Sequence, residues 1–211
     1  MPQPLPKALF ATCDVVPSPT RHSAVSRVTL QALTQHFQVD AITLKAPDLG
    51  HHEKTDRLRI FRIPAGKGDY LAQIDSFRRA MIRQLEGEEY QLVHVRSLLI
   101  GAAVAKRKAE FGAKLLVEVG HIDSIETPIL HPQIGVNKST IDKILADEDL
   151  CLREADAIIT PNKVIRDLLV ERGRRQKIHL VPDGVNIDVF DWLNARSQPT
   201  PVVLYVGSLN Q

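Results

Sequence analysis

Glycine is scarce at the start of the chain, because none of its 11 glycines precedes Gly50. A dinucleotide-binding domain carries a Gly-x-Gly-x-x-Gly turn directly after its first strand, where small residues let the backbone approach a pyrophosphate. No such turn follows the first apolar run, Lys7–Thr12. The later loop with Gly66 and Gly68 has no third glycine, and there is no Walker A sequence. The sequence therefore disfavours NAD binding through that fingerprint, and we expect no cofactor.

Cysteine is also rare, since Cys13 and Cys151 are the only two and neither belongs to a Cys-x-x-Cys or metal-ligand pattern. We expect both to be reduced cytosolic thiols that pack as small apolar side chains. The run His51-His52-Glu53 resembles part of a metal site, but no third ligand occurs at a suitable spacing. We interpret this run as a polar loop and expect no metal.

Neither sign of charge is in large excess: the net charge is +2, with 25% charged and 44% hydrophobic residues. This balance is too mild to indicate a nucleic-acid partner. Basic clusters at 78–79, 106–108 and 172–177 are interpreted as solvated surface, with contact to an anionic membrane as the alternative. The longest apolar stretch, Leu98–Ala105, is far too short to span a bilayer. We therefore expect a soluble, cytoplasmic protein, with peripheral membrane contact left open.

Apolar runs typical of strands alternate with segments of helical period along most of the chain. Segment 58–63 alternates apolar and basic residues, which indicates an exposed or edge strand, and 46–56 is interpreted as a surface loop. The alternation predicts an α/β fold, with a doubly wound parallel sheet of about six or seven strands. We expect strands at 7–12, 39–44, 58–63, 92–95, 115–119, 157–159 and 178–181, and helices across 25–37, 71–85, 97–112, 140–154 and 162–172.

Ligands bind such sheets at the carboxyl ends of the strands, which marks the loops after Thr12, Val95, Val119 and Thr160. The densest polar cluster, Glu118–Glu126, follows one of these strands. Glu118 is costly to bury unless a partner meets it, and His121 could donate to a ligand oxygen. A purely structural interpretation of the cluster is a polar loop in which Ser124 and Glu126 cap the following helix.

The end of the chain indicates a boundary between two domains. The strand at 178–181 runs into Pro182-Asp183-Gly184, a turn in which glycine supplies a positive φ. A connector with proline and serine at 197–201 then leads to an apolar strand at 202–206 that ends in glycine. We interpret residues 1–196 as one Rossmann-like domain and 197–211 as a linker and the first strand of a second domain.

Several segments together resemble the amino-terminal domain of group 1 (family 4) glycosyltransferases. Segment 182–190 is similar to the family's Pro-x-Gly-Val-Asp-x-x-x-Phe, and 118–126 to a Glu-Val-Asn-Gly-Leu-Pro-Ser-Ile-Glu variant. Tyr90–Ser97 resembles Tyr-Asp-Val-Val-His-x-His-Ser, and 149–161 resembles a helix and strand that end in Ala-Asp-x-(apolar)-(apolar)-x-Pro-Ser. Four departures are evident: Gly120-His121 replaces Asn-Gly, Asp123 replaces proline, Asn162 replaces serine, and Thr20–Ser23 stands where many relatives have Gly-Gly.

The resemblance implies the acceptor-side half of a GT-B enzyme that transfers a sugar, with retention, from a nucleotide-sugar donor to an acceptor hydroxyl. The acceptor would be a saccharide or a lipid-linked saccharide. His121 and Glu118 are the implied catalytic pair, with His121 contacting the donor sugar. Most groups that face the donor diphosphate would belong to the second domain, so the chain alone should be inactive. The expected substrate-binding residues are Arg21, His22, Arg96, Ser97, Ser124 and Glu126.

Two other functions stay open on the sequence alone. One is a sugar-nucleotide epimerase, which shares the two-domain fold, and the other is a non-catalytic α/β domain that binds a ligand or another protein. A Glu-x-x-x-x-x-x-x-Glu pattern beyond Gln211, with arginine and lysine upstream of it, would favour the transferase.

Overall fold

The computed structural model describes residues 5–65, 68–173, 178–184 and 203. Within them the chain forms an eight-stranded sheet in the order β3-β4-β2-β1-β5-β6-β7-β8. All neighbouring strands are parallel except β3 and β4, which are antiparallel. The strands are β1 (Lys7–Val15), β2 (Gln38–Lys45), β3 (His52–Lys54), β4 (Leu58–Pro64), β5 (Leu92–Val95), β6 (Lys114–Glu118), β7 (Ala157–Thr160) and β8 (Ile178–Leu180).

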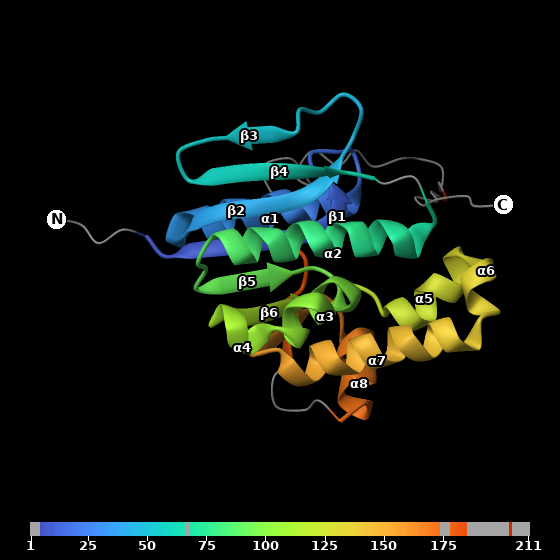
Figure 1. Cartoon of the computed structure of the whole chain (residues 1–211). Helices are drawn as coiled ribbons and strands as arrows, with labels where there is room; N and C mark the ends of the chain where they lie inside the picture. Colours follow the sequence, from blue (N-terminus) through green and yellow to red (C-terminus); the bar gives the residue numbers. More distant parts are fainter. Residues whose placement is uncertain (1–4, 66–67, 174–177, 185–202, 204–211) are drawn as a thin grey trace.

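Helices cover both faces of the sheet, as expected for a doubly wound fold (Figure 1). The helix α1 (Arg21–His36) lies behind the sheet in this view, whereas α2, α3 and α7 lie in front of it. The helices after α1 are α2 (Tyr70–Gly87), α3 (Leu98–Lys106), α4 (Lys108–Phe111), α5 (Asp123–Leu130), α6 (Pro132–Gly135), α7 (Lys138–Glu154) and α8 (Lys163–Glu171). The predicted fold class is thereby confirmed.

The core divides along the same two faces. On the front face, Phe77 and Met81 of α2 and Cys151 of α7 are fully buried against the sheet. On the back face a smaller cluster forms around Phe10 of β1 and Leu30 of α1. Burial raises the pKa of both cysteine thiols, so they stay protonated and pack as apolar groups.

Three sequence-based expectations about the elements were wrong. The supposed loop at 46–56 contains β3, in which His52 pairs with Phe61 of β4. Strand β4 is consequently not at the edge of the sheet, because β3 takes that place and β2 flanks β4 on the other side. The helix expected from Ser97 to Gly112 is interrupted at Arg107, so that α3 and α4 are separate helices.

The expected domain boundary falls in a part of the chain that the structure does not describe. The proposed boundary at 196–197 and the strand at 202–206 lie outside the described residues, apart from Val203. The described chain therefore supplies one doubly wound domain that runs from β1 to β8.

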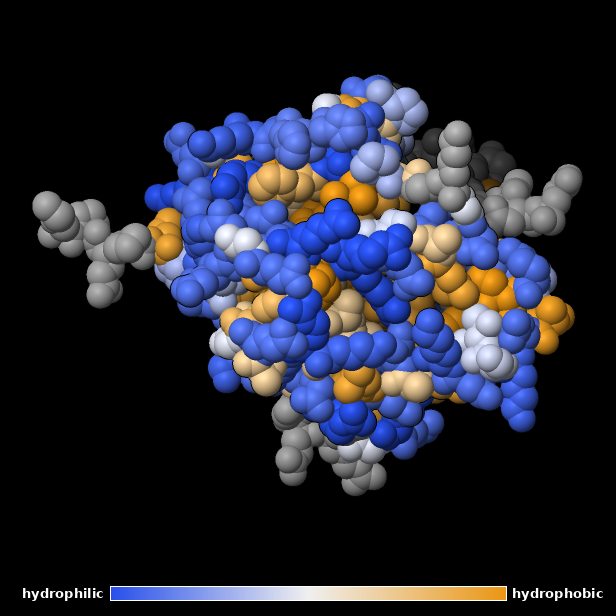
Figure 2. All heavy atoms as spheres, viewed as in Figure 1, coloured by the Kyte–Doolittle hydropathy of each residue, from blue (hydrophilic) through white to orange (hydrophobic). Residues whose placement is uncertain are grey.

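Part of the molecular surface is apolar. In the face shown by Figure 2 most of the surface is hydrophilic, whereas an apolar area lies at the right, over α5 and α6. Its exposed side chains are Ile125, Ile129, Leu130 and Val136. The described helices include none that is long and apolar enough to cross a membrane.

Candidate functional site

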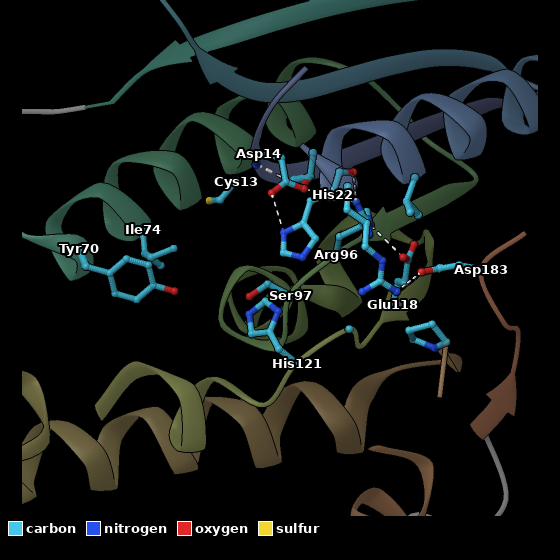
Figure 3. Close-up of a pocket in the computed structure, with 15 residues that line it drawn as sticks. Cys13, Asp14, His22, Tyr70, Ile74, Arg96, Ser97, Glu118, His121 and Asp183 are labelled. Atoms are coloured by element: carbon cyan, nitrogen blue, oxygen red, sulfur yellow. Dashed lines mark hydrogen bonds and ion pairs between the residues drawn. The ribbon is translucent and has the colours of Figure 1, made fainter. Parts of the chain in front are cut away.

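A pocket of about 90 Å³ opens at the carboxyl edge of the sheet (Figure 3). The end of β1, the start of α1 and the loops after β5, β6 and β7 contribute to it, at the edge expected for an open parallel sheet. The pocket is lined by Thr12, Cys13, Asp14, Arg21, His22, Val25, Tyr70, Ile74, Arg96, Ser97, Glu118, Gly120, His121, Pro161 and Asp183. A complete small-molecule site usually has several hundred Å³, so this pocket holds only part of a large ligand.

Strand register places the two most buried charged groups of the pocket side by side. His94 of β5 pairs with Leu116 of β6, so Arg96 and Glu118, two residues later, emerge together at the carboxyl edge. Arg96 Nε donates to Glu118 Oε1 over 2.9 Å. Because strand side chains alternate between faces, His94, Arg96 and Glu118 all point toward the α1 side of the sheet.

Arg96 also joins β5 to the start of the first helix. Its Nη1 atom donates to Ser26 Oγ at 2.5 Å, to the His22 carbonyl at 3.0 Å and to Asp14 Oδ2 at 3.3 Å. The inward face of α1 begins with Ser23 and Ser26, both fully buried. Their small polar side chains leave room for the guanidinium, which ties the ends of β1 and β5 to α1.

Glu118 has a second basic neighbour deeper in the sheet. His94 is 2% exposed, and its Nε2 lies 3.2 Å from Glu118 Oε2 without the geometry of a hydrogen bond. Burial raises the pKa of Glu118, but His94 and Arg96 outweigh this effect and hold the pKa below its ordinary value. The carboxylate is therefore ionised at neutral pH.

His121 lies in the loop between β6 and α5 and faces a buried carboxylate. Its Nε2 is 3.3 Å from Asp123 Oδ1, and Asp123 is 1% exposed. This partner raises the pKa of His121 above its ordinary value despite the cost of burial. Asp123 Oδ2 also accepts from Ser97 Oγ and the Leu99 amide, so one carboxylate fixes the histidine and the start of α3.

Two further ion pairs lie on the rim, at the start of α1. Arg21 Nη2 is 2.5 Å from Asp183 Oδ2, which connects α1 to the segment after β8. Gly184, next to Asp183, does not adopt the positive φ that the sequence suggested. His22 Nδ1 lies 3.6 Å from Asp14 Oδ1. The Thr20 hydroxyl accepts from the Ser23 amide and caps α1, which sets the direction in which these two side chains leave the helix.

The structure brings together six of the eight site residues expected from sequence: Arg21, His22, Arg96, Ser97, Glu118 and His121 all line the pocket. Ser124 and Glu126 are not among the lining residues. The predicted capping role of Ser124 is wrong, because α5 begins at Asp123 and its N-cap residue is Ile122, whose side chain makes no hydrogen bond. Instead, the fully buried Glu148 of α7 accepts from the Ser124 amide and hydroxyl, both at 2.8 Å, and Arg172 bonds to both side chains.

Sequence reasoning missed the acidic partners of the pocket. Asp14, Asp123 and Asp183 each pair with a basic residue that it did identify. Asp14 follows a strand at the expected edge, and Asp123 is two residues from His121, so position alone could have suggested both. The pairing of Asp183 with Arg21 spans 162 residues and depends on the tertiary fold.

A second hollow, between α1 and the β3–β4 hairpin, is wider and more open. Its floor includes Leu30 and Ile60, and its rim carries Arg27, Glu53 and Arg57. It lacks the convergence of side chains from several strand ends that distinguishes the first pocket. In the part of the chain that the structure covers, no cluster of three His, Cys, Asp or Glu side chains is arranged to hold a metal ion.

Solved glycosyltransferases share this fold at low sequence identity. Sucrose-phosphate synthase from Thermosynechococcus elongatus superposes with a TM-score of 0.66 at 18% identity, over 88% of this chain and 50% of the other. Anabaena HepE in complex with UDP and glucose superposes with a TM-score of 0.56 at 11% identity, over 87% of this chain and 46% of the other. Phytolacca americana UGT2 with UDP-2-fluoro-glucose and pterostilbene superposes with a TM-score of 0.51 at 13% identity, over 87% of this chain and 55% of the other. The chain thus spans about half the length of these proteins.

Sequence comparison identifies the family directly. No curated protein matches the chain. The family model described as "Glycosyl transferase 4-like domain" matches residues 23–184, which include α1 from its third residue, all the parallel strands after β1 and most of the pocket. The chain therefore belongs to the glycosyl transferase 4-like domain family, and its fold is that of the GT-B glycosyltransferases.

Proposed function

We propose that this chain is the acceptor-side half of a retaining glycosyltransferase that moves a sugar from a nucleotide-sugar donor to an acceptor hydroxyl. The observation that carries the proposal is the convergence of Arg21, His22, Arg96, Ser97, Glu118 and His121 in one pocket at the carboxyl edge of a sheet of this family. The structural neighbours support a nucleotide-sugar donor, because HepE is described in complex with UDP and UGT2 in complex with a UDP-sugar.

In the proposed reaction the bond between the sugar and the diphosphate breaks through an oxocarbenium-like transition state. His121 is our candidate to donate a hydrogen bond to the donor sugar, since Asp123 holds its ring and favours the protonated form. The ionised Glu118 is our candidate to accept a hydrogen bond from the acceptor or to orient the loop that carries His121. Both groups would act by positioning and charge stabilisation.

The size of the pocket supports a division of the site between two domains. A cavity of about 90 Å³ has room for a few water-sized groups, far less than a nucleotide sugar needs. We propose that residues 1–196 form the acceptor-side domain, that 197–211 begin a donor-binding domain, and that closure of the two excludes water from the reacting oxygens. We also propose a cytoplasmic protein whose acceptor is a saccharide or a lipid-linked saccharide, the latter reached by peripheral membrane contact.

The test uses the 211-residue chain alone and the same chain joined to the continuation of its reading frame. The joined protein is assayed with UDP- and GDP-linked sugars and a panel of saccharide acceptors, and NMR of the product reports the anomeric configuration. We expect turnover with retention for the joined protein and none above background for the chain alone. Inversion of the anomeric centre, or micromolar donor affinity of the chain alone, would contradict the proposal.

A substitution tests the role of His121 in the joined protein. His121→Ala should lower kcat/KM by about tenfold or more, equivalent to about 1.4 kcal/mol of transition-state stabilisation, with little change in Tm. His36→Ala is the matched control, because His36 lies at the exposed end of α1 away from the pocket. If His121→Ala reduced only Tm, His121 would be a structural loop residue.

A further inference from the structure

Every basic side chain that lines the pocket has an acidic partner within this chain. The lining contains two arginines and two histidines. Arg21 pairs with Asp183 at 2.5 Å and Arg96 with Glu118 at 2.9 Å. His22 faces Asp14 at 3.6 Å and His121 faces Asp123 at 3.3 Å. The positive charge of the pocket is therefore already balanced before any ligand arrives.

The helix N-termini at the same edge are also satisfied from within the chain. An unoccupied helix N-terminus attracts phosphate through its free amides and its dipole. Here Thr20 accepts from an amide of α1 and Asn162 from an amide of α8. Three carboxylates serve the other helices: Asp69 accepts from the Ala72 amide of α2, Asp123 from the Leu99 amide of α3, and Glu148 from the Ser124 amide of α5. These three carboxylates place negative charge at helix N-termini that would otherwise stabilise an anionic ligand.

The remaining wall of the pocket is apolar. Ile74 of α2 and the ring of Tyr70 line one side of it, and Val25 of α1 also contributes to the lining. Figure 3 shows Tyr70 and Ile74 on one side of the pocket, with His22, Arg96 and His121 nearer the strand ends. A sugar ring has hydroxyls around its edge and C–H groups on its faces, so it can contact both kinds of wall at once.

We infer that this pocket takes the hydroxyl-bearing edge of an uncharged, polyhydroxylated ligand, a saccharide or polyol, and excludes ligands that carry a phosphate there. A hydroxyl can donate to Asp14 or Glu118 and accept from Arg96 without separating any pair. A phosphate would have to take Arg96 or Arg21 from its carboxylate and leave that carboxylate beside a second anion. Under the proposed function this ligand is the acceptor, and the donor diphosphate contacts groups outside this pocket.

The test follows backbone amide resonances of Arg96, Gly120 and His121 by NMR in the 211-residue chain. The neutral probes are D-glucose, D-mannose, D-galactose and myo-inositol, and the anionic probes are inorganic phosphate and D-glucose 6-phosphate, all at matched ionic strength. We expect saturable shifts with at least one neutral probe, and smaller shifts with a higher Kd for either anion. Equal or stronger shifts with the anions, or no shift with any neutral probe, would overturn the inference.

A gain of phosphate affinity tests the cause of the exclusion. Asp183→Asn releases Arg21 from an exposed pair, and pairs of this kind contribute up to about 1 kcal/mol, so the Kd for inorganic phosphate should fall by about two- to fivefold. Asp167→Asn is the matched control, because it releases Arg166 on α8, outside the pocket lining. An unchanged Kd in Asp183→Asn would contradict the role of pairing. If the joined protein transfers no sugar while the neutral probes still bind, the proposed function fails and the ligand class stands.

Discussion

Arg96 Nε and Glu118 Oε1 lie 2.9 Å apart and join the carboxyl ends of β5 and β6. Both side chains are only 10% exposed, so each charge has lost most of its hydration. Such a pair adds little net stability when it is intact, but removal of one member leaves a buried charge without its partner. The same contact thus connects the stability of the domain with the geometry of the pocket.

Substitution of Arg96 should therefore be costly to the fold. We expect Arg96→Met to lower the free energy of unfolding by about 3 kcal/mol, because Glu118 loses its closest cation and Ser26 loses a donor. Urea unfolding followed by circular dichroism measures this quantity. Arg166→Met removes a partly exposed arginine and should change the free energy of unfolding by less than about 0.5 kcal/mol. Equal effects of the two substitutions would show that the Arg96 network contributes nothing specific.

The same network predicts a dependence of stability on pH. The pKa of Glu118 in the folded state lies below the ordinary glutamate value of 4.5. A lowered carboxyl pKa contributes stability above the unfolded-state pKa, and this contribution is lost as the pH falls through the folded-state pKa. Glu118→Gln should therefore flatten the loss of unfolding free energy below about pH 4.5. Parallel acid profiles for both proteins would contradict the assigned pKa shift.

His121 titrates in the opposite sense. Its folded-state pKa is raised above 6.5, so its contribution to stability is complete below that pH and is lost as the pH rises through the folded-state pKa. We expect Asp123→Asn to lower the pKa of the His121 imidazole, which NMR titration of the ring protons measures directly. An unchanged His121 pKa would show that Asp123 does not hold the ring.

Sequence patterns predicted the strands that consist of runs of apolar residues. The runs at 92–95 and 115–119 were expected as strands, and β5 and β6 lie there. Strand β3 was missed because all three of its residues are exposed, and only pairing with β4 makes His52–Lys54 a strand. The helix across 25–37 was expected, but the apolar residues alone do not define its buried face, since Val28 is 65% exposed and Ser26 is buried. Ser26 faces inward because it accepts a hydrogen bond from Arg96, which follows it by 70 residues.

The site, like the fold, was predicted in part. A parallel sheet brings the residues after each strand to one edge, so the convergence of His22, Arg96 and His121 followed from topology. The carboxylate that meets Arg21 did not follow from topology, because Asp183 lies 162 residues away in the chain. Glu148, which holds the Ser124 amide, reaches α5 from the middle of α7 and gave no signal in the sequence.

Close packing of α3 against the strands and α7 supports the last prediction. Gly101 of α3 faces Cys151 of α7, and a Cβ atom added at Gly101 would overlap the Cys151 sulfur and lie 3.0 Å from Val95 Cγ2. We expect Gly101→Ala to lower the free energy of unfolding by about 1–3 kcal/mol, because the core cannot expand without moving β5 or α7. Thermal or urea unfolding measures the change.

Two further variants separate this steric effect from a general effect of glycine. Gly87, the last residue of α2, has no atom within 4 Å of an added Cβ, so Gly87→Ala should cause no loss and a gain of up to about 0.5 kcal/mol. Cys151→Ala removes the sulfur that the new methyl group would overlap. In that background Gly101→Ala should cost at least about 1 kcal/mol less, a coupling typical of side chains in direct contact. If the cost of Gly101→Ala were the same in both backgrounds, the approach of α3 to α7 would not be what requires glycine at this position.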